Sequence, residues 1–211
     1  MAISYPRSDI LTLTGFVPPF TFDMAPRQEL SRLAGGTTIG KDFGPALWAA
    51  TYTTEDLRND VMLDYQAVLA SLDGVIRTFE AWDLRRPAPR LYPSGVGAND
   101  GKLRSVAANQ RALSLSGLNA GQTISRGDYL SFTYGTNRAL HQAMETVAAN
   151  GSGVTAEFEV RPFIRPGFTL DATVNLKAPR GLFTLVPGSV EPRQATGKHG
   201  SLTFQAGQYL E

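Results

Sequence analysis

The chain has 211 residues, with 20 Lys and Arg against 19 Asp and Glu, a net charge of +1. This balance generates no strong field, so non-specific binding to nucleic acid or an anionic membrane is excluded as its main role. The absence of cysteine excludes disulfides, thiolate catalysis and Cys-based zinc sites, and it suits folding in a reducing cytoplasm. No apolar run approaches about 18 residues and no export signal is recognisable, so neither membrane insertion nor export is expected.

Glycine and proline, 21 and 13 residues, are spread along the chain without a period. Such a distribution predicts many short strands joined by turns, and the 42% hydrophobic content is enough for a core. The first half begins with a β-prone stretch around Pro18-Pro19, which is expected to form two short strands or a strand and a loop. Further strands are predicted at Gln28 to Leu33, Thr37 to Ile39 and Ala46 to Thr53.

One long helix is predicted next, because apolar residues recur at spacings of three and four: Leu57, Val61, Tyr65, Val68, Leu69 and Leu72. Thr53 is the expected N-cap, with Asp56 three residues later, and Gly74 is the expected left-handed terminator. A helix of about 18 residues spans ~27 Å, enough to lie across a sheet.

A strand is predicted at Val75 to Trp82, followed by a loop rich in Pro, Gly and Arg from Leu84 to Gly101. This loop is the expected boundary between two parts of the fold. Past it, the pattern predicts strands around Leu103 to Ala107, Ala112 to Leu115, Tyr129 to Tyr134, Thr155 to Arg161, Thr173 to Leu176, Phe183 to Val186 and Leu202 to Gln205.

Two segments of the second part stand out. From Gly117 to Leu130 the sequence predicts strand, turn, short strand, tight turn and strand, with Gly121 and Gly127 in the turns. Between Leu140 and Val147 the apolar spacing is helical, whereas Gly151-Ser152-Gly153 just beyond is typical of a hairpin turn. The residues alone leave helix and strand open for this second segment.

No catalytic, cofactor-binding or metal-binding residue is predicted, and the chain is not expected to be an enzyme. His141 and His199 lack the spacing of metal ligands, and Glu157 and Glu159 lie on one solvated strand face rather than across a cleft. No nucleophile elbow, phosphate loop or dinucleotide fingerprint occurs.

A basic and aromatic cluster is the most distinctive local feature. Arg85, Arg86 and Arg90 are interleaved with prolines beside Trp82 and Tyr92. Such a cluster can bind a phosphate, a sugar or an acidic partner, or it can be a charged loop closed by local ion pairs.

Several segments in this order resemble the distal tail proteins of tailed bacteriophages and prophages. They are Gln28-Glu29-Leu30-Ser31, Gly44 to Trp48, the long helix, Phe79 to Pro89, Gly117 to Leu130, Val160 to Gly167 and Leu185 to Ser189. The resemblance covers most of the chain, and the ordered set is more specific than any single segment. It implies a structural protein of the virion tail, assembled in the host cytoplasm.

The resemblance further implies a ring, commonly of six copies, that joins the tail tube protein to the hub or baseplate protein. A tape measure protein is a further implied partner, DNA only passes through the lumen, and no cofactor or membrane is involved. The implied fold is mainly β: a tail-tube-like β-sandwich flanked by one helix, from residues 1–100 with 180–211 returning, plus a second small β-barrel or sandwich from residues 101–179. It also favours a strand at Leu140 to Val147.

In such a ring, loops dock on the neighbouring proteins, and two loops are candidates. Ala34 to Phe43 offers Gly35, Gly36 and Lys41, and Leu84 to Gly101 offers Arg85, Arg86 and Arg90. Two rival functions are a carbohydrate-binding adhesion module, in which Trp82 and Tyr92 stack on sugars, and a cell-wall hydrolase, for which no carboxylate stands out.

Overall fold

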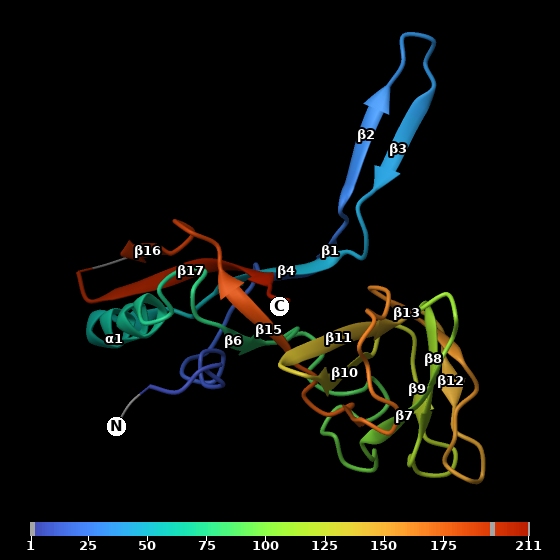
Figure 1. Cartoon of the computed structure of the whole chain (residues 1–211). Coiled ribbons are helices and arrows are strands. Elements are labelled where there is room, and N and C mark those ends of the chain that lie inside the picture. The colour runs from blue at the N-terminus through green and yellow to red at the C-terminus, as the bar shows by residue number, and fades with distance from the viewer. Residues whose placement is uncertain (1–2, 195–196, 211) are drawn as a thin grey trace.

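The computed structural model describes residues 3–194 and 197–210 and confirms a mainly β fold, with a single helix in that part of the chain (Figure 1). One half is a seven-stranded sheet in the order β1-β4-β17-β15-β6, with β5 and β16 also paired to β17. Its strands are β1 (Thr21–Ala25), β4 (Leu47–Thr53), β5 (Leu57–Arg58), β6 (Phe79–Ala81), β15 (Gly181–Leu185), β16 (Glu191–Gln194) and β17 (His199–Gln208).

The other half is a closed barrel in the order β10-β11-β13-β8-β7-β14. Its strands are β7 (Gly101–Val106), β8 (Ala112–Ser116), β10 (Tyr129–Tyr134), β11 (Asn137–Ala143), β13 (Phe158–Arg161) and β14 (Thr173–Asn175). A small ribbon of β9 (Thr123–Ile124) and β12 (Val147–Ala148) lies beside it. A second ribbon, β2 (Gln28–Arg32) with β3 (Thr38–Asp42), stands apart from both halves (Figure 1).

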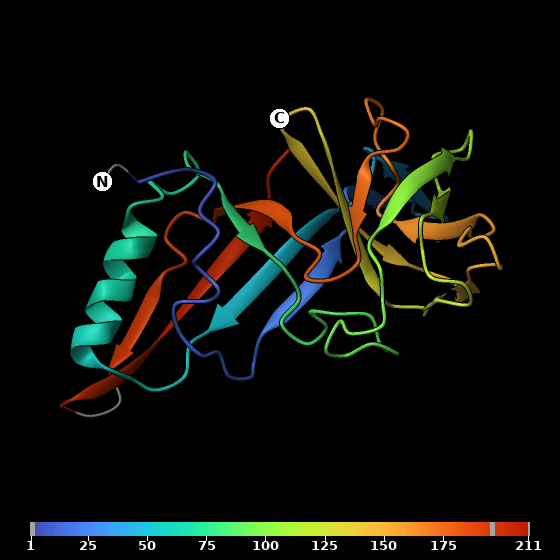
Figure 2. The ribbon, with the colours of Figure 1, turned by 90° about the horizontal axis from the view of Figure 1, so that it is seen from below.

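One face of the sheet carries the core of the first half. Alternate residues of its central strands, including Tyr52 and Phe204, are buried on this face against the helix α1 (Asn59–Ala70). Met62, Tyr65 and Leu69 form the buried stripe of α1, and the Tyr65 hydroxyl donates to the Ile10 carbonyl oxygen at 2.9 Å. The helix therefore covers one sheet face, at the end of the molecule away from the barrel (Figure 2).

The predicted helix is correct in place but too long. Leu57 and Arg58 pair with β17 as a short strand instead of opening the helix, and Thr53 belongs to β4. The predicted Thr53 cap is therefore wrong, and Arg58 occupies the N-cap position without a side-chain cap hydrogen bond. Sheet pairing outcompetes the apolar periodicity at this end, so α1 has 12 residues and spans ~18 Å.

The strand predicted at Val75 to Trp82 is also too long. Asp73 and Gly74 both have positive φ, and the Arg77 N–H donates back to the Leu72 carbonyl at 3.0 Å. These turns delay the strand until Phe79, where β6 pairs with β15 on one side and the backbone of Arg7 bonds on the other. The left-handed conformation predicted for Gly74 is confirmed.

Between Leu140 and Val147 the strand interpretation is confirmed for β11, with a break before the short β12. β11 pairs with β10 over six residues, and its side chains are buried on both faces. Leu140 joins the core of the sheet half, whereas Ala139 and Ala143 face the barrel interior. A strand buried on both faces carries closely spaced apolar residues, which explains its helix-like spacing.

The turns of Gly117 to Leu130 are as predicted. Gly121 and Gly127 have φ of +74° and +88°, a region that favours glycine, and β9 and β10 follow them. The hairpin that opens the barrel lies before this segment in the chain. β7 and β8 pair with each other before it and form that hairpin.

Candidate functional site

The β2–β3 ribbon, hereafter the arm, is the most prominent surface feature of the molecule (Figure 1). It extends the paired strands β1 and β4, and the Phe43 N–H donates to the Arg27 carbonyl at 2.8 Å where the arm begins. Pro26 and Pro45 flank this foot, and proline restricts the backbone there. All ten strand residues of the arm are exposed, so the arm projects into solvent from a stiff base.

The arm carries large apolar side chains on both of its faces. Ile39 is 52% exposed and lies opposite Ser31, whereas Leu30 is 65% exposed and lies opposite Gly40, on the other face. An isolated two-stranded hairpin is only marginally stable in water, and exposed apolar side chains that gather on one element mark an interaction site. The arm is therefore a surface that another molecule can cover on both sides.

Of the docking residues predicted in this region, two lie in the turn at the tip of the arm and one lies within a strand. Gly35 and Gly36 form the exposed turn at the tip of the arm, where Gly36 has a φ of +85°. Lys41 lies within β3 rather than in a loop, directly opposite Glu29, and its ammonium group lies 5.3 Å from the Phe43 ring. The loop prediction was wrong for Lys41 because cross-strand pairing continues to Asp42.

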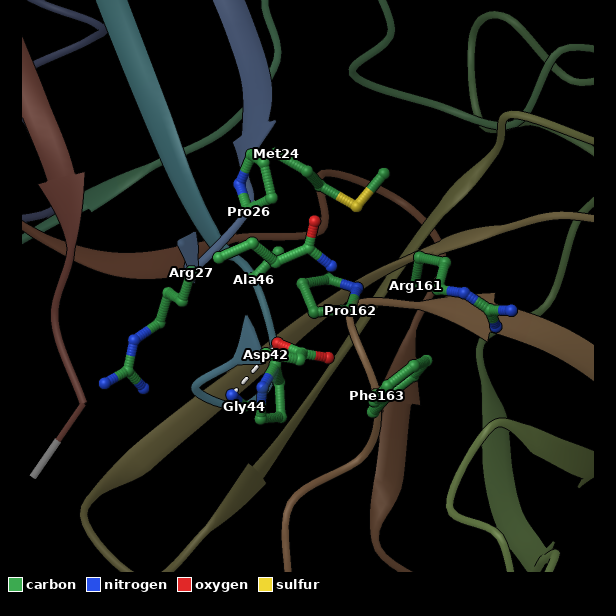
Figure 3. Close-up of a pocket in the computed structure, with 11 residues that line it drawn as sticks. Met24, Pro26, Arg27, Asp42, Gly44, Ala46, Arg161, Pro162 and Phe163 are labelled. Atoms are coloured by element: carbon green, nitrogen blue, oxygen red, sulfur yellow. Dashed lines mark hydrogen bonds between the residues drawn. The ribbon is translucent and has the colours of Figure 1, made fainter. Parts of the chain in front are cut away.

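A hollow of about 110 Å³ lies where the foot of the arm meets the barrel (Figure 3). Pro162 and Phe163 of the barrel face Pro26 and Ala46 of the foot, while the side chains of Arg27 and Arg161 extend to opposite sides (Figure 3). Its walls are mainly apolar.

On the barrel side of that hollow, the Phe163 ring is held between two guanidinium groups. Arg111 lies 4.4 Å and Arg161 lies 5.0 Å from the ring centroid. Cation–π contacts of this kind fix the ring beside the foot of the arm. Arg161 also pairs with Glu159 at 3.0 Å.

A second, more polar hollow of about 410 Å³ lies where the linker after β6 meets the barrel. We call it the arginine hollow, and its lining is Asp83, Arg85, Arg86, Arg126, Gly127, Tyr129 and Gln142. The predicted cluster is thus brought together in part: Arg85 and Arg86 line the hollow, whereas Arg90 is not part of its lining. The Arg90 backbone N–H donates to Asp128 Oδ1 at 2.8 Å.

Two buried carboxylates fix the arginines of this hollow. Asp83 accepts from the Arg85 guanidinium at 2.9 Å and from the Tyr129 hydroxyl at 2.9 Å. Asp128 accepts from the backbone N–H groups of Arg90 and Ser125, and Arg86 Nη1 lies 3.5 Å from it. Burial raises the pKa of Asp128, and these N–H groups and the arginines oppose that rise.

Gly127 allows Arg86 to reach this position. A Cβ atom on Gly127 would lie 2.8 Å from Arg86 Nη1. Arg126 precedes it in the same turn and has an exposed side chain at the rim of the hollow. The sequence had not indicated Arg126, because it joins Arg85 and Arg86 only through the packing of the barrel on the linker.

The sheet face opposite α1 is lined by short side chains, and we call it the open face. On β1, β4 and β17 it presents Thr21, Asp23, Ala25, Leu47, Ala49, Thr51, Thr53, Ser201, Thr203, Gln205 and Gly207, all exposed or partly exposed. Asp23 is the only charged residue among them. Thr53 and Thr203 share a hydroxyl hydrogen bond of 3.1 Å across the strands. On β16 the same face carries Glu191 and Arg193, which lie opposite Thr203 and Ser201 and pair with each other at 3.3 Å. The result is a broad, mostly polar surface with few charges.

The aromatic residues of the predicted cluster do not form an exposed platform. Trp82 is 8% exposed, and the Arg180 guanidinium lies 4.6 Å from its ring. Tyr92 is partly exposed and accepts a 3.4 Å hydrogen bond from the Thr123 N–H. Trp82 therefore presents no free face of the kind that stacks on sugars, whereas Tyr92 stays partly exposed.

The two histidines lie in separate parts of the fold. His199 begins β17, whereas His141 lies in β11, stacked on Phe132, with its Nδ1 2.7 Å from the Pro162 carbonyl oxygen. Because a carbonyl only accepts, Nδ1 carries the proton, and the buried Nε2 has no partner in the described residues. Burial lowers the pKa of His141 to about 4.

This histidine predicts a pH dependence of stability. Below pH 6.5 the unfolded chain takes up a proton on His141, but the folded chain does not until about pH 4. The free energy of unfolding should therefore fall by up to ~3 kcal/mol as the pH drops through that window. Urea unfolding at a series of pH values tests this, with His141→Gln as the control that lacks the titration. Equal pH slopes for both proteins would contradict it.

Among residues 3–194 and 197–210, no helix is long and apolar enough to cross a membrane. The same described residues hold no group of three or more His, Cys, Asp or Glu side chains arranged to bind a metal ion.

The candidate site is therefore a set of surfaces: the arm, the hollow at its foot, the arginine hollow and the open face. The chain matches no protein-family model, and a search of curated proteins finds no significant match. Its function must be inferred from these surfaces.

Proposed function

We propose that the chain is a ring-forming structural protein of a long-tailed bacteriophage tail tip, a distal tail protein that joins the tail tube to the hub or baseplate. In this role it acts by geometry rather than catalysis. It assembles in the bacterial cytoplasm into a closed ring, commonly of six copies, within the virion tail. The ordered sequence segments that resemble distal tail proteins motivate this proposal, and the surfaces of the fold support it.

The open face is the observation that carries the proposal. An antiparallel sheet with one face on its core and the other in water can line a channel when copies are repeated around an axis. Most side chains of this face are threonine, serine, alanine or glycine, which are short. Asp23 adds one negative charge, and Glu191 and Arg193 at the β16 edge offset each other. Such a wall allows a polyanion such as DNA, or a tape measure protein, to pass without binding to it.

The sheet edges and the arm suit contacts between copies and with neighbouring rings. β1 and β16 flank the sheet on opposite sides of β17, and all four residues of β16 are exposed. Edge strands offer unpaired backbone groups to another chain. The arm supplies a second contact, because binding to another molecule would remove its exposed apolar side chains from water. A ring that closes by rotation requires two different complementary surfaces on each copy, and this fold offers several.

Native mass spectrometry of the purified chain over a concentration series tests the proposal. We expect one closed stoichiometry to dominate as the concentration rises, with six copies the leading expectation. A chain that stays monomeric throughout would contradict it. Glycan binding by that monomer, lost on Trp82→Ala, would favour a carbohydrate-binding module instead.

A further inference from the structure

The arginine hollow carries positive charge that its own carboxylates do not neutralise. Arg85, Arg86 and Arg126 line it. Arg85 pairs with Asp83 and Arg86 with Asp128, so the charge of Arg126 remains. Asp83 is fully engaged by Arg85 and Tyr129, and Asp128 is engaged by backbone N–H groups. The side chain of Arg126 has no hydrogen bond or ion pair within the described residues.

Positive and negative residues are also unevenly distributed along the chain, and the part that contains the arginine hollow is the basic one. Residues 84–179, the linker and barrel, hold eleven Lys and Arg against six Asp and Glu. The remaining residues hold nine against thirteen. The near-zero net charge therefore conceals a basic half and an acidic half, and copies that meet head to tail bring opposite charges together.

The exposed face of α1 offers a complementary surface at the opposite end of the molecule (Figures 1 and 2). Its exposed residues are Asp60, Val61, Leu63, Asp64, Ala67 and Ala70, with no basic side chain among them. Leu63 is 60% exposed, and no ion pair or hydrogen bond holds the Asp64 carboxylate in the described residues. Asp60 already pairs with Arg58, so Asp64 is the carboxylate that remains free.

We propose that α1 of one copy docks on the arginine hollow of the next, with Asp64 paired to Arg126. This contact rests on the proposed ring, and it adds one specific pair of surfaces to the sheet edges and the arm. The small side chains of Ala67 and Ala70 allow close approach, and Leu63 is covered when the ring closes. Because α1 and the hollow are different surfaces, the contact is heterologous and propagates around a closed ring.

Charge reversal tests this pairing. Arg126→Glu and Asp64→Arg should each raise the concentration needed for ring assembly by about tenfold or more, since each places like charges together. The double variant should restore assembly to near the wild-type concentration. Arg104→Glu is the matched control, an exposed barrel arginine outside the hollow, and it should assemble normally. Thermal unfolding of every variant checks that the fold is retained.

The outcomes separate this contact from the ring itself. If the wild type forms rings and either single reversal assembles equally well, the contact is wrong and the ring stands. If both singles fail and the double variant also fails, the pairing of Asp64 with Arg126 is wrong. A wild-type chain that never forms rings overturns the ring and with it this contact.

Discussion

Replacing Trp48 by alanine should lower the free energy of unfolding by about 4 kcal/mol. Trp48 is 2% exposed in the sheet half, stacks on Phe22 at 5.1 Å and meets the Tyr129 ring of the barrel edge-on at 5.5 Å. Its indole N–H donates to the Leu140 carbonyl oxygen of β11 at 2.8 Å. The substitution therefore opens a cavity and leaves a buried acceptor unpaired where the two halves meet.

The control is Trp48→Phe, which keeps an aromatic ring but removes the donor. This variant should lower the free energy of unfolding by about 1–3 kcal/mol, less than the alanine variant does. Most of the loss comes from the unpaired carbonyl of Leu140 and the smaller ring. Chemical denaturation followed by circular dichroism measures both. If Trp48→Ala unfolds at the same denaturant concentration as the wild type, Trp48 does not join the two halves as described.

Gly153→Ala should be comparably damaging, with an expected loss of about 3 kcal/mol or more. Gly153 has a φ of +72°, and a Cβ atom there would lie 2.1 Å from the Leu118 carbonyl oxygen. That oxygen belongs to the backbone and cannot move alone, because the Leu118 N–H also donates to the Gly153 carbonyl at 3.1 Å. Both backbone strain and a clash oppose the methyl group.

Two other glycines separate these effects. Gly121 has a φ of +74° but open space around its Cβ position, so Gly121→Ala should cost about 1 kcal/mol from strain alone. Gly151 has neither a positive φ nor a near neighbour, and Gly151→Ala should change stability by less than ~0.5 kcal/mol. Thermal and urea unfolding should rank the three variants in that order. Equal losses at Gly153 and Gly121 would exclude the backbone clash.

Local patterns were sufficient to predict much of this fold. Glycine positions predicted the turns at Gly121 and Gly127, and alternating apolar residues predicted most of the strands. The two errors at α1 have one cause, since sheet pairing of Leu57 and Arg58 with β17 is a long-range contact that periodicity cannot reveal. β11 needed the resemblance to be read as a strand, because both of its faces are buried.

The surfaces were harder to predict than the elements. Gln28 to Leu33 and Thr37 to Ile39 were correctly expected as strands, yet nothing local indicates that they project from the body uncovered. Arg85 and Arg86 were visible as a cluster, but Arg126 reaches them only through tertiary packing. Buried Asp83 and Asp128 turn that cluster into a fixed hollow, and their burial is also a property of the folded chain.

A cryo-electron microscopy reconstruction of the purified assembly tests the central claim most directly. We predict a closed ring in which the open face of each sheet, with Thr51 and Thr203 at its centre, lines the channel. The arm should project from one face of the ring or cover a neighbouring copy. Monomers only, or a ring whose open faces are buried between copies or turned outward, would contradict the proposed function.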